Sequence, residues 1–241
     1  LVVIIFAVFI ARRIVRPLLQ LSSVVRSVEA GNLQQNISIN VKNEIGDLAG
    51  YFAAMLHSLR HAAEETDDTD WLKSGQAELA DQMRGSKNIK TMARDIITFT
   101  AKYLDCQLGS FYLLEDDGLL QLEGGYALAT DVGDHDKIAL GEGLLGQAAI
   151  EKKIKVISNV PSTYINVGSS LGSTTPRELI IVPLLHGEKL VGLMELASFK
   201  SLNEVQKNFL HSISEHIAVA MSSTCQSAKT ETLLGKTQLQ A

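Results

Sequence analysis

The sequence predicts a multidomain chain in which a coiled-coil pair of helices is followed by an α+β domain. Two observations predict the helical part: apolar residues recur at alternating spacings of three and four positions over 14–28, and again over 45–59. The third observation is a change of pattern near residue 88, after which short β-rich runs alternate with turn residues and helices. The length of 241 residues suffices for one or two domains.

Each of the two helices carries a narrow apolar stripe of the kind that packs against neighbouring helices. The first stripe consists of Ile14, Leu18, Leu21, Val25 and Val28. The second stripe consists of Ile45, Leu48, Phe52, Met55 and Leu59. Two such helices joined by a short connector can run parallel, but they leave a narrow seam uncovered. We therefore expect a second copy of the chain to complete a four-helix bundle as a parallel homodimer.

The chain begins with eleven apolar residues, LVVIIFAVFIA, which are followed by Arg12, Arg13 and Arg16. A full membrane span needs about 20 apolar residues. Because the first residue is Leu1 rather than Met, we interpret residues 1–11 as the end of a transmembrane helix, with the arginines at its cytoplasmic side. The alternative is a buried core helix. The first interpretation predicts a membrane anchor and a location at the cytoplasmic side of the bacterial inner membrane.

A linker helix is expected over 61–87, and its middle, 64–70, is acidic and lacks apolar seam residues. Continuing the heptad from Leu59 would place Lys73 in the seam, whereas Trp71, Leu72, Leu79 and Met83 restart the apolar pattern in a different phase. A phase shift locally unwinds or overwinds a coiled coil. Two interpretations remain open: a weak point that switches, or a solvated helix face without a switching role.

Helices and strands follow one another over residues 88–223. The expected helices cover 88–103 and 144–151. A last helix is expected to begin at a capping box formed by Asn203 and Gln206. The expected strands cover 107–114, 119–127, 137–140, 154–158, 178–185 and 190–198. The segment 159–176 is predicted to be a long loop rich in Ser, Gly and Thr. Six strands with helices at both ends predict an α+β domain of ordinary size.

The helical part resembles the HAMP signalling module. The matching residues are Pro17, Gly31-Asn32-Leu33, Glu44-Ile45-Gly46-Asp47-Leu48, Phe52 and Met55. Asn43 stands where the family usually has an acid, a small departure from its pattern. The resemblance implies that residues 12–60 transmit a signal. The residues expected to carry it are Pro17, Leu21, Val25, Val28, Glu44, Ile45, Leu48, Phe52, Met55 and Leu59.

The α+β part resembles a GAF domain, a fold with a central antiparallel sheet. The matching stretches are GSFYLLEDDG at 109–118, GEGLLGQA at 141–148, VPSTY at 160–164, VPLL at 182–185 and VGLMELASF at 191–199. The order of parts resembles the cytoplasmic half of bacterial membrane sensor histidine kinases, including hybrid ones. Residues 224–241 then resemble the start of an output coiled-coil helix that leads to a kinase module in the same parent chain.

In GAF domains a ligand, where there is one, sits between the sheet and a long loop. By position, the candidates for lining such a pocket are Phe111, Tyr126, Leu144, Tyr164, Ile165 and Glu195. The alternative is that all but Glu195 are core residues and the cavity is filled. The family's cyclic-nucleotide motif, an Asn-Lys pair followed by Phe and Asp-Glu, is absent from the sequence, so we do not expect cyclic GMP to bind.

Other motifs indicate neither a cofactor nor catalysis. GEGLLG at 141–146 has the glycine spacing of a dinucleotide site, but no acid follows at the end of the next strand, so we interpret it as a tight turn into a helix. His135 lies between Asp134 and Asp136 and is interpreted as part of a solvated turn rather than a metal or haem ligand. Cys106 and Cys225 have no CxxC spacing, which argues against a disulfide scaffold or a zinc site. We expect no cofactor and no metal.

The sequence thus predicts a signal relay of a two-component system, with no enzyme in these residues and no nucleic-acid partner, given the net charge of −5 and few aromatic residues. Three alternatives remain open. The relay can feed a diguanylate cyclase or another effector instead of a kinase. The GAF domain can be the primary small-molecule sensor, or the chain can be a structural dimerisation spacer.

Overall fold

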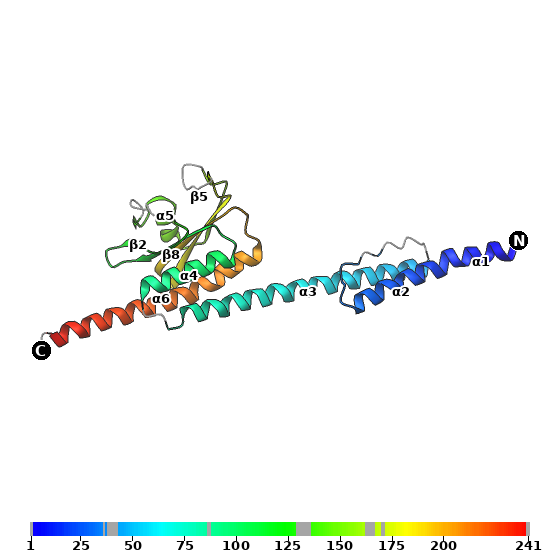
Figure 1. Cartoon of the computed structure of the whole chain (residues 1–241), viewed down its shortest axis with the longest axis horizontal. Helices are drawn as coiled ribbons and strands as arrows, with labels where there is room; N and C mark the ends of the chain where they lie inside the picture. The colour runs from blue at the N-terminus through cyan, green and yellow to red at the C-terminus, as the bar shows by residue number, and fades with distance from the viewer. Residues whose placement is uncertain are drawn as a thin grey trace. The chain divides into compact units, whose positions relative to one another are not determined.

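The computed structural model describes residues 2–35, 37, 43–85, 88–128, 136–161, 167–169 and 172–239. The chain forms two compact units that divide between Trp71 and Leu72, so the helix α3 (Glu44–Met83) contributes to both (Figure 1). Within the described part of the chain, no helix combines the length and the apolar character needed to cross a membrane.

The first unit begins with a helical run made of α1 (Val2–Ile10), the π-helix η1 (Ala11–Val15) and α2 (Arg16–Glu29). Pro17 stands at the start of α2, where it has no N–H to donate and its ring crowds the carbonyl one turn back. The N–H of Arg16 bonds the carbonyl of Ala11, five residues back. The widened turn therefore lies where proline disturbs the regular hydrogen-bond ladder.

The connector between α2 and α3 is defined at both ends by helix caps. Gly31 has φ +87°, a left-handed conformation that glycine adopts readily where a helix ends. Asn43 accepts a hydrogen bond from the backbone N–H of Gly46 at 3.2 Å and so caps the N-terminus of α3. The side chain of Arg60 on α3 donates to the carbonyls of Leu33 and Gln35, which holds the connector against that helix.

The second unit is built on a sheet whose described strands are six in number, in the order β3-β2-β1-β8-β7-β4, with every neighbouring pair antiparallel. The strands are β1 (Leu108–Leu114), β2 (Leu119–Tyr126), β3 (Lys137–Ala139), β4 (Lys155–Ser158), β7 (Glu178–His186) and β8 (Lys189–Ser198). The prediction of an α+β domain with a central antiparallel sheet is confirmed.

Helices cover both faces of this sheet (Figure 1). On one face, α4 (Ile89–Tyr103) contacts β1 and β2, and α6 (Glu204–Leu239) contacts β7 and β8. On the other face lies α5 (Gly143–Glu151), and a cluster of buried apolar side chains fills the space beneath it. The end of α3 packs against α6, where the side-chain amide of Gln76 donates a hydrogen bond to the hydroxyl of Ser212 at 2.9 Å.

The structure differs from the sequence prediction in the segment 159–176, and it shows how the last helix continues. The segment 159–176, expected to be a loop, contains a short hairpin of β5 (Val167–Ser169) and β6 (Gly172–Thr174). The last helix runs without interruption to Leu239, so the expected output helix is the continuation of α6. The capping box at its start is confirmed, because Asn203 and Gln206 exchange two side-chain to backbone hydrogen bonds.

Candidate functional site

The predicted signal-transmission residues divide into a buried and an exposed set in the first unit. Pro17 and Leu21 are buried, and Val28, Ile45 and Phe52 are half-buried. Val25, Leu48, Met55 and Leu59 remain exposed, as does Glu44 in the first turn of α3. The single chain therefore covers only part of the apolar stripe that the heptad pattern predicts.

Two residues that the sequence analysis did not single out complete the buried part of this unit. Ala49 and Leu56 on α3 are almost fully buried, and they are seven residues apart, so they lie on one face of the helix. Each follows an exposed stripe residue, Leu48 or Met55, by one position. The face of α3 that packs within the chain is therefore rotated from the exposed stripe. A helix with two adjacent apolar faces needs two packing partners to bury them.

In the second unit, a polar group lies on the sheet face beneath α5. Ser110 on β1 is directly opposite Glu195 on β8, and its hydroxyl donates a hydrogen bond to Oε2 of Glu195 at 3.2 Å. Ile181 flanks Glu195 on the other side and belongs to the apolar cluster that includes α5 residues. A half-buried carboxylate thus stands at the middle of an otherwise apolar face.

Tyr112, two residues beyond Ser110 on the same face, adds a phenol to this group and is almost fully buried. Burial, and to a smaller extent the nearby charge of Glu195, together raise the pKa of Tyr112 to about 12, although a hydrogen bond with Ser110 opposes them. The phenol therefore keeps its proton at physiological pH. A carboxylate acceptor beside two hydroxyl groups suits a ligand that carries a cation or several hydrogen-bond donors.

The structure brings only some of the predicted pocket residues to this face. Leu144 packs against the apolar cluster beneath α5, on the same side as Glu195. Phe111 lies on the opposite face, because a side chain at Gly109, two residues earlier, would meet Ile97 of α4. Tyr126 stands opposite Gly109 and shares that face. Tyr164 and Ile165 lie outside the described residues, as does His135.

Ser110 and Tyr112 were not found from the sequence, and the reason is physical. Both faces of β1 are buried, so the sequence of the strand shows no regular apolar–polar alternation that would tell which residues face α5. An assignment shifted by one residue moves every side chain to the other face.

The glycine-rich turn at 141–146 packs tightly, as the interpretation of a turn into a helix requires. A Cβ at Gly146 would lie 2.3 Å from the carbonyl oxygen of Ala139 and 2.8 Å from the backbone nitrogen of Gly141. The side chain of Glu142 accepts the N–H of Ala139 at 3.1 Å. These contacts join the end of β3 to the start of α5.

Neither cysteine has the environment of a reactive thiolate. Burial, with a smaller contribution from the charges of Asp105 and Glu178, raises the pKa of Cys106 to about 12. Burial also raises the pKa of Cys225. In the part of the chain that the structure describes, no three His, Cys, Asp or Glu side chains are grouped so that they could hold a metal ion.

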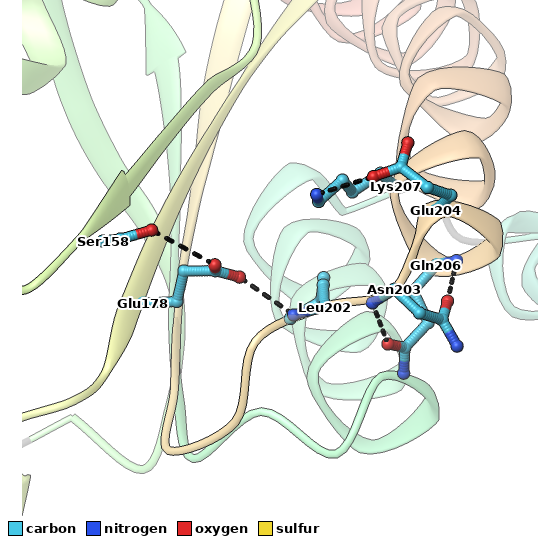
Figure 2. Close-up of polar contacts among 7 residues, drawn as sticks. All are labelled: Ser158, Glu178, Leu202, Asn203, Glu204, Gln206 and Lys207. Atoms are coloured by element: carbon cyan, nitrogen blue, oxygen red, sulfur yellow. Dashed lines mark hydrogen bonds and ion pairs between the residues drawn. The ribbon is translucent and has the colours of Figure 1, made fainter.

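The start of α6 is fastened to the sheet by a buried carboxylate (Figure 2). Glu178, the first residue of β7, accepts the N–H of Leu202 at 2.9 Å and the hydroxyl of Ser158 at 3.4 Å.

At the other end of the unit, a groove of about 790 Å³ lies between α6 and the two turns that join β1 to β2 and β7 to β8. The amino group of Lys229 on α6 reaches across to both carboxylate oxygens of Asp116 at 2.7 Å.

Comparison with known proteins agrees with this architecture. The GAF domain model matches residues 86–222, and the HAMP domain model matches residues 9–61. No curated protein matches the chain. Solved structures share the fold of the second unit at low sequence identity.

The GAF domain of a phosphoenolpyruvate-protein phosphotransferase from Coxiella burnetii is 13% identical, with a TM-score of 0.55, over 66% of this chain and 96% of that chain. Its counterpart from Acinetobacter is 14% identical, with a TM-score of 0.55, over 66% and 97%. A free methionine-R-sulfoxide reductase from Neisseria meningitidis, solved with its substrate, is 17% identical, with a TM-score of 0.50, over 66% and 91%.

At these identities the solved structures establish the fold alone, while the GAF match covers more than half of the chain. The two family matches also give the order of the signalling domains, with HAMP ahead of GAF. The chain therefore belongs to the GAF domain family and is a HAMP–GAF signalling module.

Proposed function

We propose that this chain is the relay segment of a membrane-anchored bacterial sensor histidine kinase and that it works as a parallel homodimer. A conformational change enters from the membrane side, passes through the HAMP domain and α3 to the GAF domain, and leaves along α6. The kinase module follows in the same parent chain, and the relay lies on the cytoplasmic side of the inner membrane.

The observation that carries this proposal is the uncovered apolar stripe of the HAMP domain. Six stripe residues keep 41–51% of their surface exposed in the single chain: Ile14, Leu18, Val25, Leu48, Met55 and Leu59. They recur at heptad spacing, and apolar heptad positions are stable only when a facing helix buries them. HAMP domains typically act as dimers, and a second copy supplies two such facing helices.

The relay mechanism is a shift between two packings of the resulting four-helix bundle. A packed core has discrete arrangements rather than a continuous range, so a small input displacement selects one of them. The input acts only through the difference between its free energies of interaction with the two packings. Helix α3 begins in the HAMP region and ends in the GAF unit without a break, and α6 begins in the GAF unit and runs beyond it to Leu239.

The test is the association state of the 241-residue chain in detergent micelles or nanodiscs. Met55→Asp places a charge in the stripe and should convert the dimer to a monomer, because the carboxylate would be buried against apolar side chains. His57→Asp is the matched control, since His57 is exposed on the same helix away from the stripe. Sedimentation that shows a monomer for the unmodified chain, or a dimer for Met55→Asp, would refute the proposal.

A second candidate function is that the GAF domain is itself the primary small-molecule sensor. The polar group of Ser110, Tyr112 and Glu195 beneath α5 favours it, because a carboxylate and two hydroxyls on an apolar face can orient a polar ligand. Native mass spectrometry of the purified chain, with an absorption spectrum, should then show an added mass that Glu195→Gln loses. A dimer without added mass or visible band would favour the relay alone.

A further inference from the structure

The end of α3 has a different packing partner from its beginning. Residues 64–70 are exposed on all sides of the helix, so none of the residues that the structure describes covers this acidic stretch. Burial resumes in the second unit, where Gly75 and Leu79 are buried and Leu72 and Gln76 are half-buried. The shift of apolar phase that the sequence shows therefore coincides with the point at which α3 joins the GAF unit.

The approach of α3 to this unit is closest at Gly75. A Cβ at this position would lie 2.5 Å from Cε1 of Tyr103 and 2.7 Å from Cε2 of Phe209. Real Cβ contacts do not reach such distances, so the helix sits against these two rings only because residue 75 has no side chain. The backbone of Gly75 also makes a hydrogen bond with the Tyr103 phenol.

One ring belongs to the helix that precedes β1 in the chain, and the other belongs to the helix that follows β8. Tyr103 is the last residue of α4, and Phe209 lies in the second turn of α6. Their ring centroids are 5.1 Å apart, and Phe99 stacks on Tyr103 at 5.3 Å. One glycine thus touches both the helix that leads into the sheet and the helix that leaves the unit.

We propose that Gly75 is the positioning residue at which movement of α3 reaches the GAF unit, through its contact with Tyr103 of α4 and Phe209 of α6. This inference rests on the relay function proposed above and identifies the contact through which α3 acts on the GAF unit. A displacement of α3 along or about its axis pushes directly on the two rings, because no side chain at position 75 separates backbone from ring.

The first arm of the test examines the contact itself. Gly75→Ala should force α3 away from the rings and raise amide hydrogen-exchange rates over residues 72–83 by roughly tenfold. Trp71, the single tryptophan, lies one turn before Gly75 and should shift its emission. Gly50→Ala is the matched control: it lies in the same helix with nothing within 4 Å of an added Cβ, and should leave both readouts unchanged.

Tyr103→Phe gives a second variant that keeps the ring and removes only the phenol hydroxyl. It should raise exchange at residues 72–83 by a smaller factor than Gly75→Ala and should leave the fold intact. Exchange rates that are equal in Gly75→Ala, Tyr103→Phe and Gly50→Ala would overturn the inference, because a contact that carries movement must hold α3 in place.

The second arm separates this inference from the proposed function. Met55→Asp in the HAMP stripe should change hydrogen exchange along α6 in the otherwise unmodified chain, and this change should be lost when Gly75→Ala is added. An equal response in both backgrounds would leave the relay standing and refute the role of Gly75. If Met55→Asp left α6 unchanged in both backgrounds, while exchange over 72–83 still distinguished Gly75→Ala from Gly50→Ala, the relay function would fail and the transmission role with it.

Discussion

The backbone N–H of Leu202 donates a hydrogen bond to Oε2 of Glu178 at 2.9 Å, although only 4% of the Glu178 residue surface is exposed. Glu178 begins β7, and Leu202 directly precedes the cap of α6. Ser158 at the end of β4 donates to the same carboxylate at 3.4 Å. One buried group therefore holds together two strands and the start of the helix that leaves the GAF unit.

Replacing this carboxylate should destabilise the GAF unit. Glu178→Ala leaves the buried N–H of Leu202 without its acceptor, and an unsatisfied buried donor costs about 1–3 kcal/mol. Glu178→Gln keeps an acceptor oxygen and should cost less. Urea unfolding followed by circular dichroism measures both changes.

The control for this prediction is Glu215→Ala on α6, where the side chain is exposed. Surface substitutions of this kind change the free energy of unfolding by less than about 0.5 kcal/mol. A Glu178→Ala variant as stable as Glu215→Ala would show that the hydrogen bond to Leu202 contributes nothing.

The ion pair between Asp116 and Lys229 should be visible in the titration of both groups. The hydrogen bond with Lys229 lowers the pKa of Asp116 below its ordinary 3.8, and the same bond raises the pKa of Lys229 above 10.5. The Asp116 contribution to stability is present above its unfolded pKa and is lost as the pH falls through its folded pKa. The Lys229 contribution is lost as the pH rises through its folded pKa.

Carboxyl-detected NMR titration checks this prediction through Lys229→Ala, which should return the pKa of Asp116 toward its ordinary value. Lys229→Arg keeps a cation and should leave much of the shift in place. Both groups are exposed, so added salt should weaken the shift as well. An unchanged Asp116 pKa in Lys229→Ala would mean that the contact does not form in solution.

Tyr112 should titrate far above an ordinary tyrosine, at a pKa of about 12, mainly because it is buried. Since the folded pKa is raised, its contribution to stability is complete below pH 10 and is lost as the pH rises from about 10 through about 12. Phenolate absorbance should show a late phase that Tyr112→Phe removes.

The neighbours of Tyr112 should shift this titration in opposite directions. Glu195→Gln removes a negative charge and should lower the pKa of Tyr112, whereas Ser110→Ala removes a hydrogen bond that lowers it and should raise the pKa. If both substitutions moved the pKa the same way, the arrangement of these three side chains on the sheet face would be incorrect.

The parts of this fold that local chemistry determines were predictable from the sequence. Gly31 ends a helix, Asn203 and Gln206 begin another, and the turn at 115–118 joins two strands, because each signal depends on residues adjacent in the chain. The order of helices and strands followed from such signals. The hairpin within 159–176 was missed because its strands have three residues each and no apolar alternation.

Features that depend on tertiary packing were less accessible. The phase shift near residue 72 was visible, but no sequence pattern says that α3 there packs on Tyr103 and Phe209. Similarly, β1 is buried on both sides, so its sequence does not reveal that Tyr112 rather than Phe111 faces α5. In both cases the missing information is which of two apolar faces meets which partner.

The start of α6 offers a last prediction, because its capping box joins two residues reciprocally. Asn203 Oδ1 accepts the N–H of Gln206 at 2.8 Å, and Gln206 Oε1 accepts the N–H of Asn203 at 3.0 Å. Asn203→Ala removes the cap and should lower the free energy of unfolding by about 1 kcal/mol. Gln206→Ala removes only the returning bond and should cost less.

Asn203→Ser distinguishes a cap from a general requirement for asparagine, since serine caps helices about equally well and should restore most of the stability. Asn88→Ala tests the corresponding cap of α4, where Asn88 Oδ1 accepts the N–H of Thr91 at 3.1 Å. The two Asn→Ala costs should be similar when measured by urea unfolding. If Asn203→Ala were much more costly than Asn88→Ala, the excess would indicate that the cap also maintains the contact between Leu202 and Glu178, since Leu202 lies directly before it.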